Sequence, residues 1–420
     1  MRRIAFLLYM LASIVCHAQI IADHTVVDRY DDIPQQYIDE VKKMLVDIAG
    51  ESHSLGYRIG MNLLELYDSK FQVTTYDGSV PGVSSSYLRL GRHGAVGEAE
   101  FYTSSAAVNA YKSHITSQNT SGNPYSVIGF GWCWDMTWQN APGGIIDPVH
   151  QVRWAGSSVG GPNGNLRWGL DAGDQTLTGN SVCMDTYLNA VEQYIQHCIS
   201  NGYATKVIFT TGPVDDGYGV MAGTENGFQR EIKHDYIRNY VRGNSARILF
   251  DYADILCWNN SGVEYITNWN DGGTIRPHAN IHPDNMKDYD GSWNMISHTE
   301  DGDHIGEVGA LRLAKAMWWM LARLAGWDGG TTSVDSETDD ENDLFKYAIL
   351  QDGLYIQILN PGYSGKVSIH STNGTLLNSF LLKEDFCLIN TSELEPGIYI
   401  LTVQRDKNAQ SKKIAILQYQ

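Results

Sequence analysis

A serine and an aspartate–histidine pair are the groups in this sequence that could together perform hydrolysis. Ser52 follows Gly50 and a short apolar run, and an amphipathic pattern begins directly after it. Asp301 and His304 lie three residues apart, just before a long apolar helical pattern. A serine hydroxyl becomes a nucleophile when an imidazole removes its proton, and a carboxylate can hold that imidazole in the correct tautomer. The three side chains could therefore attack an ester carbonyl.

Each of these stretches also has a simpler interpretation. Ser52 or Ser54 could cap the helix that follows, because a serine side chain accepts from free backbone N–H groups at a helix start. Asp301 or Asp303 could cap the later helix, which would leave His304 as an ordinary surface histidine. Neither stretch by itself decides between catalysis and capping.

Short β-rich runs alternate with helical patterns along most of the chain. The runs cover 44–49, 71–76, 125–131, 206–212 and 246–256, and the helical patterns cover 63–70, 185–202 and 309–327. Apolar strands that alternate with helices are typical of a parallel sheet covered on both faces. Ligands bind at the carboxyl ends of such strands, where we expect the Gly-, Trp- and Asn-rich stretches 132–180 and 258–297 to form loops. The sequence predicts an α/β sandwich with a pocket at that edge.

The two catalytic stretches resemble the first and last sequence blocks of the SGNH (GDSL-like) hydrolase superfamily. "GESHSLGY" (50–57) is similar to the block Gly-Asp-Ser-x-Thr-x-Gly-Tyr, and "DGDHIGEVGALRLA" (301–314) is similar to the block Asp-Gly-x-His. The resemblance implies that Ser52 is the nucleophile, His304 the general base and acid, and Asp301 the orienting carboxylate. It also implies that the backbone N–H of Ser52 is one oxyanion donor. The implied fold, over about 40–328, is an SGNH-type three-layer α/β/α sandwich with a five-stranded parallel sheet.

The middle blocks of that family are matched less closely. Gly91 and Gly94 are candidates for a second oxyanion donor, although loop glycines are ordinary turn residues in most cases. The asparagine of the third block is missing from 128–138, where Trp132 or Trp134 could donate an indole N–H instead. The same tryptophans could belong to the core or stack on sugars. Loss of one donor typically costs about 10²-fold in rate, so an unreplaced asparagine predicts a slow or specialised enzyme.

The sequence implies no metal and no organic cofactor. The six cysteines have no metal-type spacing, and no disulfide pairing can be read from them. His278 and His282 are four residues apart, but the neighbouring prolines argue against a helix that would make them a zinc pair. Arg153 and Arg167 could bind a sugar carboxylate, although salt bridges are the simpler interpretation.

The two ends of the chain indicate export. Residues 1–18 have the layout of a secretory signal peptide, and a lipoprotein anchored through Cys16 is less expected because Val15 is bulky. After the first domain (19–328), an acidic linker (329–343) leads to alternating apolar and polar residues that predict a small antiparallel β-sandwich (344–420).

This last domain resembles the type IX secretion (Por) sorting domains of Bacteroidetes proteins. The similar segments are "GKVSIHSTNGTLL", "LINTSELEPGIYILTV" and "KKIAI". The resemblance implies contact with a secretion machinery and export or surface attachment. A small carbohydrate-binding sandwich is the alternative.

Charge and hydropathy narrow the choice of partners. The formal net charge of −18 disfavours nucleic acid and anionic membrane surfaces, and no run after the signal peptide is long enough for membrane insertion. We therefore expect a protein that is secreted, on the cell surface or periplasmic.

The expected activity is that of a serine esterase. It would remove ester substituents, most plausibly O-acetyl groups, from a polysaccharide or oligosaccharide. The alternatives are a glycan-binding surface protein on the same scaffold with weak or no catalysis, a sugar methyl esterase and a lipid esterase.

Overall fold

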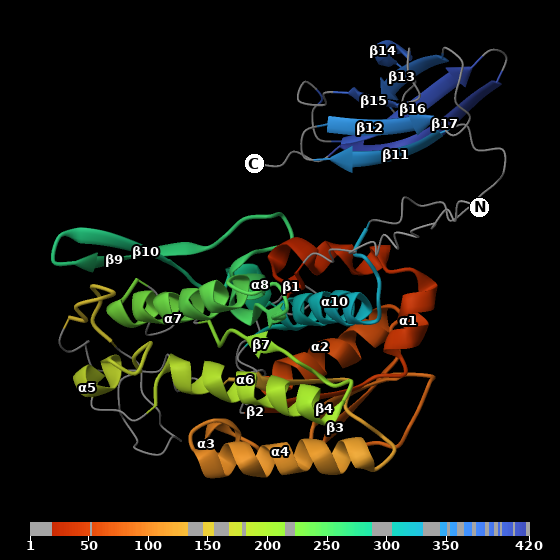
Figure 1. Ribbon diagram of the computed structural model, residues 1–420. Coiled ribbons are helices and arrows are strands. Elements are labelled where there is room, and N and C mark those ends of the chain that lie inside the picture. The colour runs from red at the N-terminus through yellow and green to blue at the C-terminus, as the bar shows by residue number, and fades with distance from the viewer. Residues whose placement is uncertain are drawn as a thin grey trace, which may run out of the picture. The chain divides into compact units, whose positions relative to one another are not determined.

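The computed structural model divides the chain into two compact units, Met1–Thr331 and Thr332–Gln420. The first unit combines helices with parallel strands, and the second is built from antiparallel strands (Figure 1). The structure describes residues 19–50, 53–132, 146–154, 168–178, 182–214, 223–287, 305–330, 345–350, 353–358, 365–371, 375–382, 386–389, 394, 397–405 and 408–416.

Parallel strands form the centre of the first unit. One sheet has the order β3 (Val73–Asp77), β4 (Leu88–Arg92), β2 (Leu45–Gly50), β5 (Val127–Gly131) and β6 (Lys206–Val207), and a second has the order β1 (Ile21–Ala22), β8 (Leu249–Phe250) and β7 (Phe209–Thr210). Only Ile208 separates β6 from β7, and its N–H donates to the carbonyl of Ile128 at 3.0 Å. Strands that follow β2 in sequence lie on both sides of it, so the carboxyl end of β2 is a topological switch point, where α/β sheets bind ligands.

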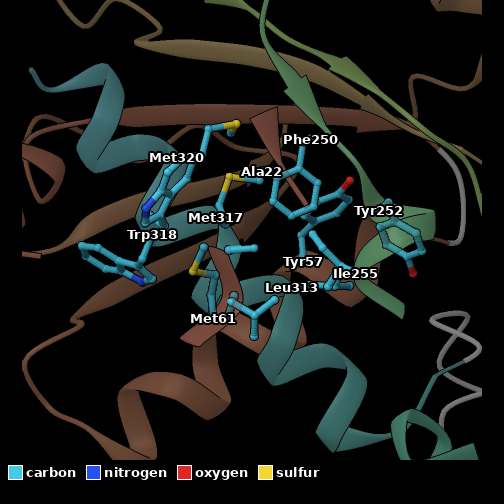
Figure 2. Packing of buried hydrophobic residues seen from close by; sticks show 14 of the residues in the cluster. Ala22, Tyr57, Met61, Phe250, Tyr252, Ile255, Leu313, Met317, Trp318 and Met320 are labelled. Carbon is cyan, nitrogen blue, oxygen red and sulfur yellow. The ribbon is translucent and has the colours of Figure 1, made fainter. Parts of the chain in front are cut away.

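Helices cover both faces of these sheets. One face carries η1 (His24–Asp32), α1 (Gln35–Val41), α2 (Ser54–Tyr67), α8 (Tyr252–Cys257) and α10 (Glu307–Leu324), and the other carries α3 (Glu98–Phe101), α4 (Ser105–Thr120), α6 (Met184–Asn201) and α7 (Glu225–Arg242). Side chains of one strand alternate between the two cores, since Val46 and Ile48 point to the first and Leu45 and Ala49 to the second. Figure 2 shows the first core, where residues of α2, α8 and α10 meet.

The predicted mixed α/β architecture with parallel strands is confirmed, whereas its assignment to the SGNH family stays a prediction. One predicted strand is largely wrong. In 246–256 only Leu249–Phe250 is extended, and α8 begins at Tyr252. Asp251 ends the strand because its carboxylate caps α8 by accepting the backbone N–H of Asp254.

The described part of the stretch 258–297, residues 258–287, has more secondary structure than the loop that the sequence predicts. It contains an antiparallel hairpin of β9 (Ile266–Asp271) and β10 (Thr274–Ala279), followed by η3 (Pro283–Met286). Gly272 and Gly273 both have positive φ, which allows the tight turn between the two strands. The short helix α5 (Asp174–Thr178) lies within the other predicted loop stretch.

The second unit is antiparallel throughout its described strands, as predicted. One sheet has the order β11 (Phe345–Leu350), β12 (Gly353–Ile358) and β15 (Phe386–Ile389). The other has the order β14 (Leu376–Leu382), β13 (Gly365–Ser371), β16 (Gly397–Arg405) and β17 (Asn408–Ile416). Alternate residues of β13 and β16, such as Val367 and Leu401, fill a small core with Phe345.

The side chain of His24, in the N-terminal segment, pairs with Asp254 of α8. Its Nδ1 lies 2.6 Å from a carboxylate oxygen of Asp254, and its ring stacks on Trp258 with 3.9 Å between centroids. Burial opposes the charged imidazole, but the hydrogen bond and charge of Asp254 outweigh it and raise the pKa of His24. For Asp254, burial acts to raise the pKa, and the bond to His24 outweighs it and lowers the pKa.

This pair predicts a pH-dependent stability. The contribution of His24 is complete below its unfolded pKa of about 6.5 and is lost as the pH rises through the higher folded pKa. Relative to His24→Gln, we expect the wild type to lose about 1 kcal/mol of unfolding free energy between about pH 6 and about pH 9. Urea unfolding at both pH values measures this difference. The same pH dependence in both proteins would contradict the prediction.

Candidate functional site

The predicted catalytic side chains lie outside the described residues. They are Ser52, Asp301 and His304, together with the predicted donor Trp134. Their contacts with one another therefore stay predictions. Gly50 and His53, which flank Ser52 in sequence, and Ile305, which follows His304, belong to the described residues.

The end of β2 has a backbone conformation that favours glycine. Gly50 has φ +125°, and a Cβ at this position would lie 1.9 Å from the carbonyl oxygen of Gly131 in β5. The backbone N–H of His53 donates to the carbonyl of Trp132 at 3.3 Å, and α2 begins at Ser54. The chain thus passes from strand to helix between Gly50 and His53, at the topological switch point of the sheet.

The segment before α10 meets the first turns of α2. A Cβ on Gly56 would lie 3.3 Å from the Cδ1 of Ile305 and 3.6 Å from the Cδ1 of Leu313. Gly56 is four residues after Ser52, and Ile305 directly follows His304. Gly56 and Ile305, which lie near the two predicted catalytic positions in sequence, therefore approach each other closely in the fold.

The two candidate glycine donors occupy different positions. Gly91 lies inside β4, opposite Asp47 of β2 and Tyr76 of β3, and a Cβ there would lie 2.0 Å from the carbonyl oxygen of Tyr76. Gly94 lies in the loop after β4, has φ +93° and has open space around its Cα. Gly94 is the better candidate for a donor at the carboxyl edge, since Gly91 belongs to the sheet interior.

A buried carboxylate anchors the loop that contains Gly94. Asp47 is fully buried in β2 and accepts the backbone N–H of His93 at 2.9 Å, while its other oxygen lies 2.8 Å from the Nδ1 of His93. The hydroxyl of Tyr111 donates to Asp47 at 2.9 Å. The ring of His93 stacks on the ring of His114. Burial and the nearby charge of His93 lower the pKa of His114 to about 4. Sequence reasoning missed this network, although an acidic residue within an apolar strand was its signal.

Two arginines share one carboxylate beside the start of α2. Arg92 contacts Asp77 at 2.9 Å and donates to the carbonyl of Gly50 at 2.8 Å. Arg58 contacts the other oxygen of Asp77 at 3.1 Å and donates to the Ser54 carbonyl at 3.3 Å. Burial lowers the pKa of Arg58, while Asp77 opposes that shift. These ion pairs hold the two arginines beside the end of β2 and the start of α2.

The described tryptophans of the 132–180 stretch belong to the core. The indole N–H of Trp132 donates to the carbonyl of Thr210 at 3.1 Å, so it is already engaged. Trp132, Trp154 and Trp168 are each at most 1% exposed, and Trp132 packs edge-on against Trp168. These three side chains belong to the core, so the suggestion that Trp132 stacks on sugars is wrong.

The other singled-out residues have local partners. Arg153 pairs with Glu225 and Asp271, at 2.9 Å each, whereas Arg167 lies outside the described residues. His278 lies in β10, 3.1 Å from the hydroxyl of Thr267. His282 lies before η3 and accepts the backbone N–H of Asp284 at 3.1 Å.

Comparison with known proteins identifies the second unit. Residues 350–417 match the family model of the secretion system C-terminal sorting domain. The chain carries a secretion sorting domain. This match supports secretion with cell-surface or outer-membrane association, and it implies contact with the secretion machinery. Within the described ranges, no helix combines the length and apolar character needed to cross a membrane.

Comparisons of the whole chain give little further information. No curated protein matches it. One similar solved structure is PorZ, described as a bacterial surface component of the type-IX secretion system of Porphyromonas gingivalis. It is 22% identical with a TM-score of 0.17, and the match covers 22% of this chain and 14% of the PorZ chain. A Cellulomonas fimi endo-beta-1,4-mannanase double mutant is 10% identical with a TM-score of 0.19, and the match covers 95% of this chain and 99% of the mannanase chain. Structural likeness this low carries no information about activity.

Proposed function

We propose that the first unit is a secreted serine esterase of SGNH type that removes O-acetyl groups from a polysaccharide or oligosaccharide. The close approach of Gly56 and Ile305 is the main support, because Gly56 follows Ser52 by four residues and Ile305 directly follows His304 in sequence. The strand-to-helix passage after Gly50 agrees with a serine whose backbone N–H faces developing negative charge. The sorting domain supports an extracellular polymer as substrate.

The proposed reaction passes through an acyl-enzyme. The hydroxyl oxygen of Ser52 attacks the ester carbonyl carbon while His304 takes its proton, and Asp301 stabilises the resulting imidazolium. The tetrahedral intermediate collapses and expels the sugar oxygen, which receives the proton from His304. Water, deprotonated by His304, then attacks acetyl-Ser52, releasing acetate and restoring the serine. Backbone N–H groups of Ser52 and Gly94 would hold the oxyanion in both steps.

A glycan-binding protein on the same scaffold is the second candidate. It is favoured by the missing asparagine of the third block and by Trp132, whose indole N–H is engaged with the Thr210 carbonyl. With that donor unavailable, any third oxyanion donor would have to come from elsewhere, such as Trp134. A site with too few donors would bind glycans but turn them over slowly.

Identifying the product that the enzyme releases from different esters tests the proposal directly. The purified chain should release acetate from acetylated polysaccharides faster than methanol from methyl-esterified polysaccharides or fatty acid from lipid esters. A fluorophosphonate reagent labels an activated serine whatever the sugar, so mass spectrometry should map its adduct to the peptide containing Ser52. No acetate release together with no adduct would overturn the esterase proposal and favour the binding protein.

A further inference from the structure

A second cluster of reactive side chains lies in two short segments far from Ser52 in sequence. The first, Ile146–Trp154, folds back on itself through a bridge between Ile146 and Arg153. The second runs from Trp168 through Asp171 into α5. One oxygen each of Asp147 and Asp174 and one nitrogen of His150 lie within 4.8 Å of one another.

The distances in this cluster are too long for hydrogen bonds. The Nε2 of His150 lies 4.0 Å from an oxygen of Asp147 and 3.8 Å from an oxygen of Asp171. Ligand atoms that share one tetrahedral ion with bonds of about 2.0–2.1 Å are themselves about 3.3 Å apart. A small contraction would thus bring the ligand atoms of Asp147, His150 and Asp174 onto one ion.

Burial makes this arrangement costly without a cation. Asp147 and Asp174 are each 2% exposed. The side chain of His150 is 28% exposed, but its Nε2 atom is buried and has no hydrogen-bond partner. In the part of the chain that the structure describes, no lysine or arginine pairs with Asp147, Asp171 or Asp174. Buried carboxylates are normally paired with cations or coordinate metals, and a buried imidazole nitrogen needs a partner.

The carboxylates are held in position by backbone groups. Asp147 accepts the N–H groups of Val149 at 3.0 Å and His150 at 2.8 Å. Asp174 accepts the N–H of Leu170 at 2.8 Å. Each carboxylate keeps free lone pairs for a second partner, since one carboxylate offers about four acceptor positions. The backbone thus orients these ligands from outside, as second-shell contacts do around metal ions.

We propose that Asp147, His150 and Asp174 bind one divalent transition-metal ion of the zinc class, and that Asp171, whose carboxylate lies 3.8 Å from the Nε2 of His150, becomes a fourth ligand. A mixed set of three carboxylates and one imidazole suits zinc, whereas calcium and magnesium prefer sets of oxygen ligands alone. The ion would join the 146–154 and 168–178 segments. Trp168, at one end of the second segment, packs against the ring of Trp132. The backbone carbonyl of Trp132 accepts the N–H of His53. The proposed role is structural support for loops beside the sheet edge, independent of esterase chemistry.

Metal binding by the purified chain without a histidine tag tests this proposal. After removal of metal with EDTA, Zn²⁺ is added and its stoichiometry and affinity are measured by titration calorimetry and elemental analysis. We expect about one Zn²⁺ per chain, and an affinity at least about 100-fold lower in His150→Gln. Asp171→Asn, a partly exposed position, should lower the affinity by at least about tenfold without disturbing the fold.

His24→Gln is the matched control, because Asp23, His24 and Asp254 form the other group of three side chains that could hold a metal ion among the described residues. In that cluster His24 is already hydrogen-bonded to Asp254, so this variant should keep wild-type Zn²⁺ binding. Absence of Zn²⁺ binding by the wild type would overturn the proposal. So would unchanged binding in His150→Gln and Asp171→Asn, loss of binding in His24→Gln, or a preference for Ca²⁺ that His150→Gln does not alter.

Discussion

Ser52→Ala is expected to lower the rate of acetate release by about 10⁴-fold or more, because removal of a catalytic serine abolishes the covalent step. Affinity for the acetylated glycan should stay close to that of the wild type, since the hydroxyl contributes mainly after binding. Acetate release under single-turnover conditions and equilibrium glycan binding measure the two effects separately. The fluorophosphonate adduct should disappear in the same variant.

Ser54→Ala provides a control two residues away on the same segment. Ser54 is buried at the first position of α2, and its hydroxyl lies 3.3 Å from a guanidinium nitrogen of Arg58. Loss of that contact should cost about 1 kcal/mol of stability and leave acetate release within a few-fold of wild type. If Ser54→Ala abolishes release and Ser52→Ala does not, Ser52 is not the nucleophile.

Much of the central fold was predictable because its elements follow simple patterns. All six residues of β2 are buried, as a strand covered on both faces requires, and the sequence shows them as a nearly unbroken apolar run. Helix α10 buries most of its length and was equally clear. In both cases the hydrophobic pattern alone carried the information.

Helix α7 was missed because its buried face is polar. Arg230, Lys233 and His234 are fully buried, and Arg238 pairs with Asp251 at 2.7 Å. Such residues erase the apolar periodicity by which helices are recognised. The sequence likewise predicts one long strand over 246–256, because nothing local marks Asp251 as the residue that ends the strand and caps α8.

The candidate site was predictable in outline only. Ser52, Asp301 and His304 could be proposed because residue type and order are visible in sequence. The Asp47–His93 contact joins residues 46 positions apart, and it could not be seen before the sheet register was known. The proposed metal ligands Asp147 and Asp174 likewise come together only through loop packing, which sequence periodicity does not encode.

Gly50→Ala is expected to destabilise the first unit by about 3–5 kcal/mol and to remove most esterase activity. Two effects add at this position. The φ of +125° is strained for any residue with a Cβ, and that Cβ would lie 1.9 Å from the carbonyl oxygen of Gly131. Because a backbone atom cannot move aside cheaply, β2 and β5 must separate where the predicted nucleophile follows. Urea unfolding and acetate release of the variant measure both losses.

Gly78→Ala separates the two effects, because Gly78 has a similar φ of +103° and nothing lies within 4 Å of its Cβ position. This control retains the backbone strain without the collision, so it should cost about 1–2 kcal/mol and keep its activity. Equal destabilisation by both substitutions would mean that strain alone accounts for Gly50. If Gly50→Ala is stable but inactive, the substitution acts only on the geometry of the turn. If the variant is both stable and active, the close approach of Gly50 to Gly131 is not required by the site.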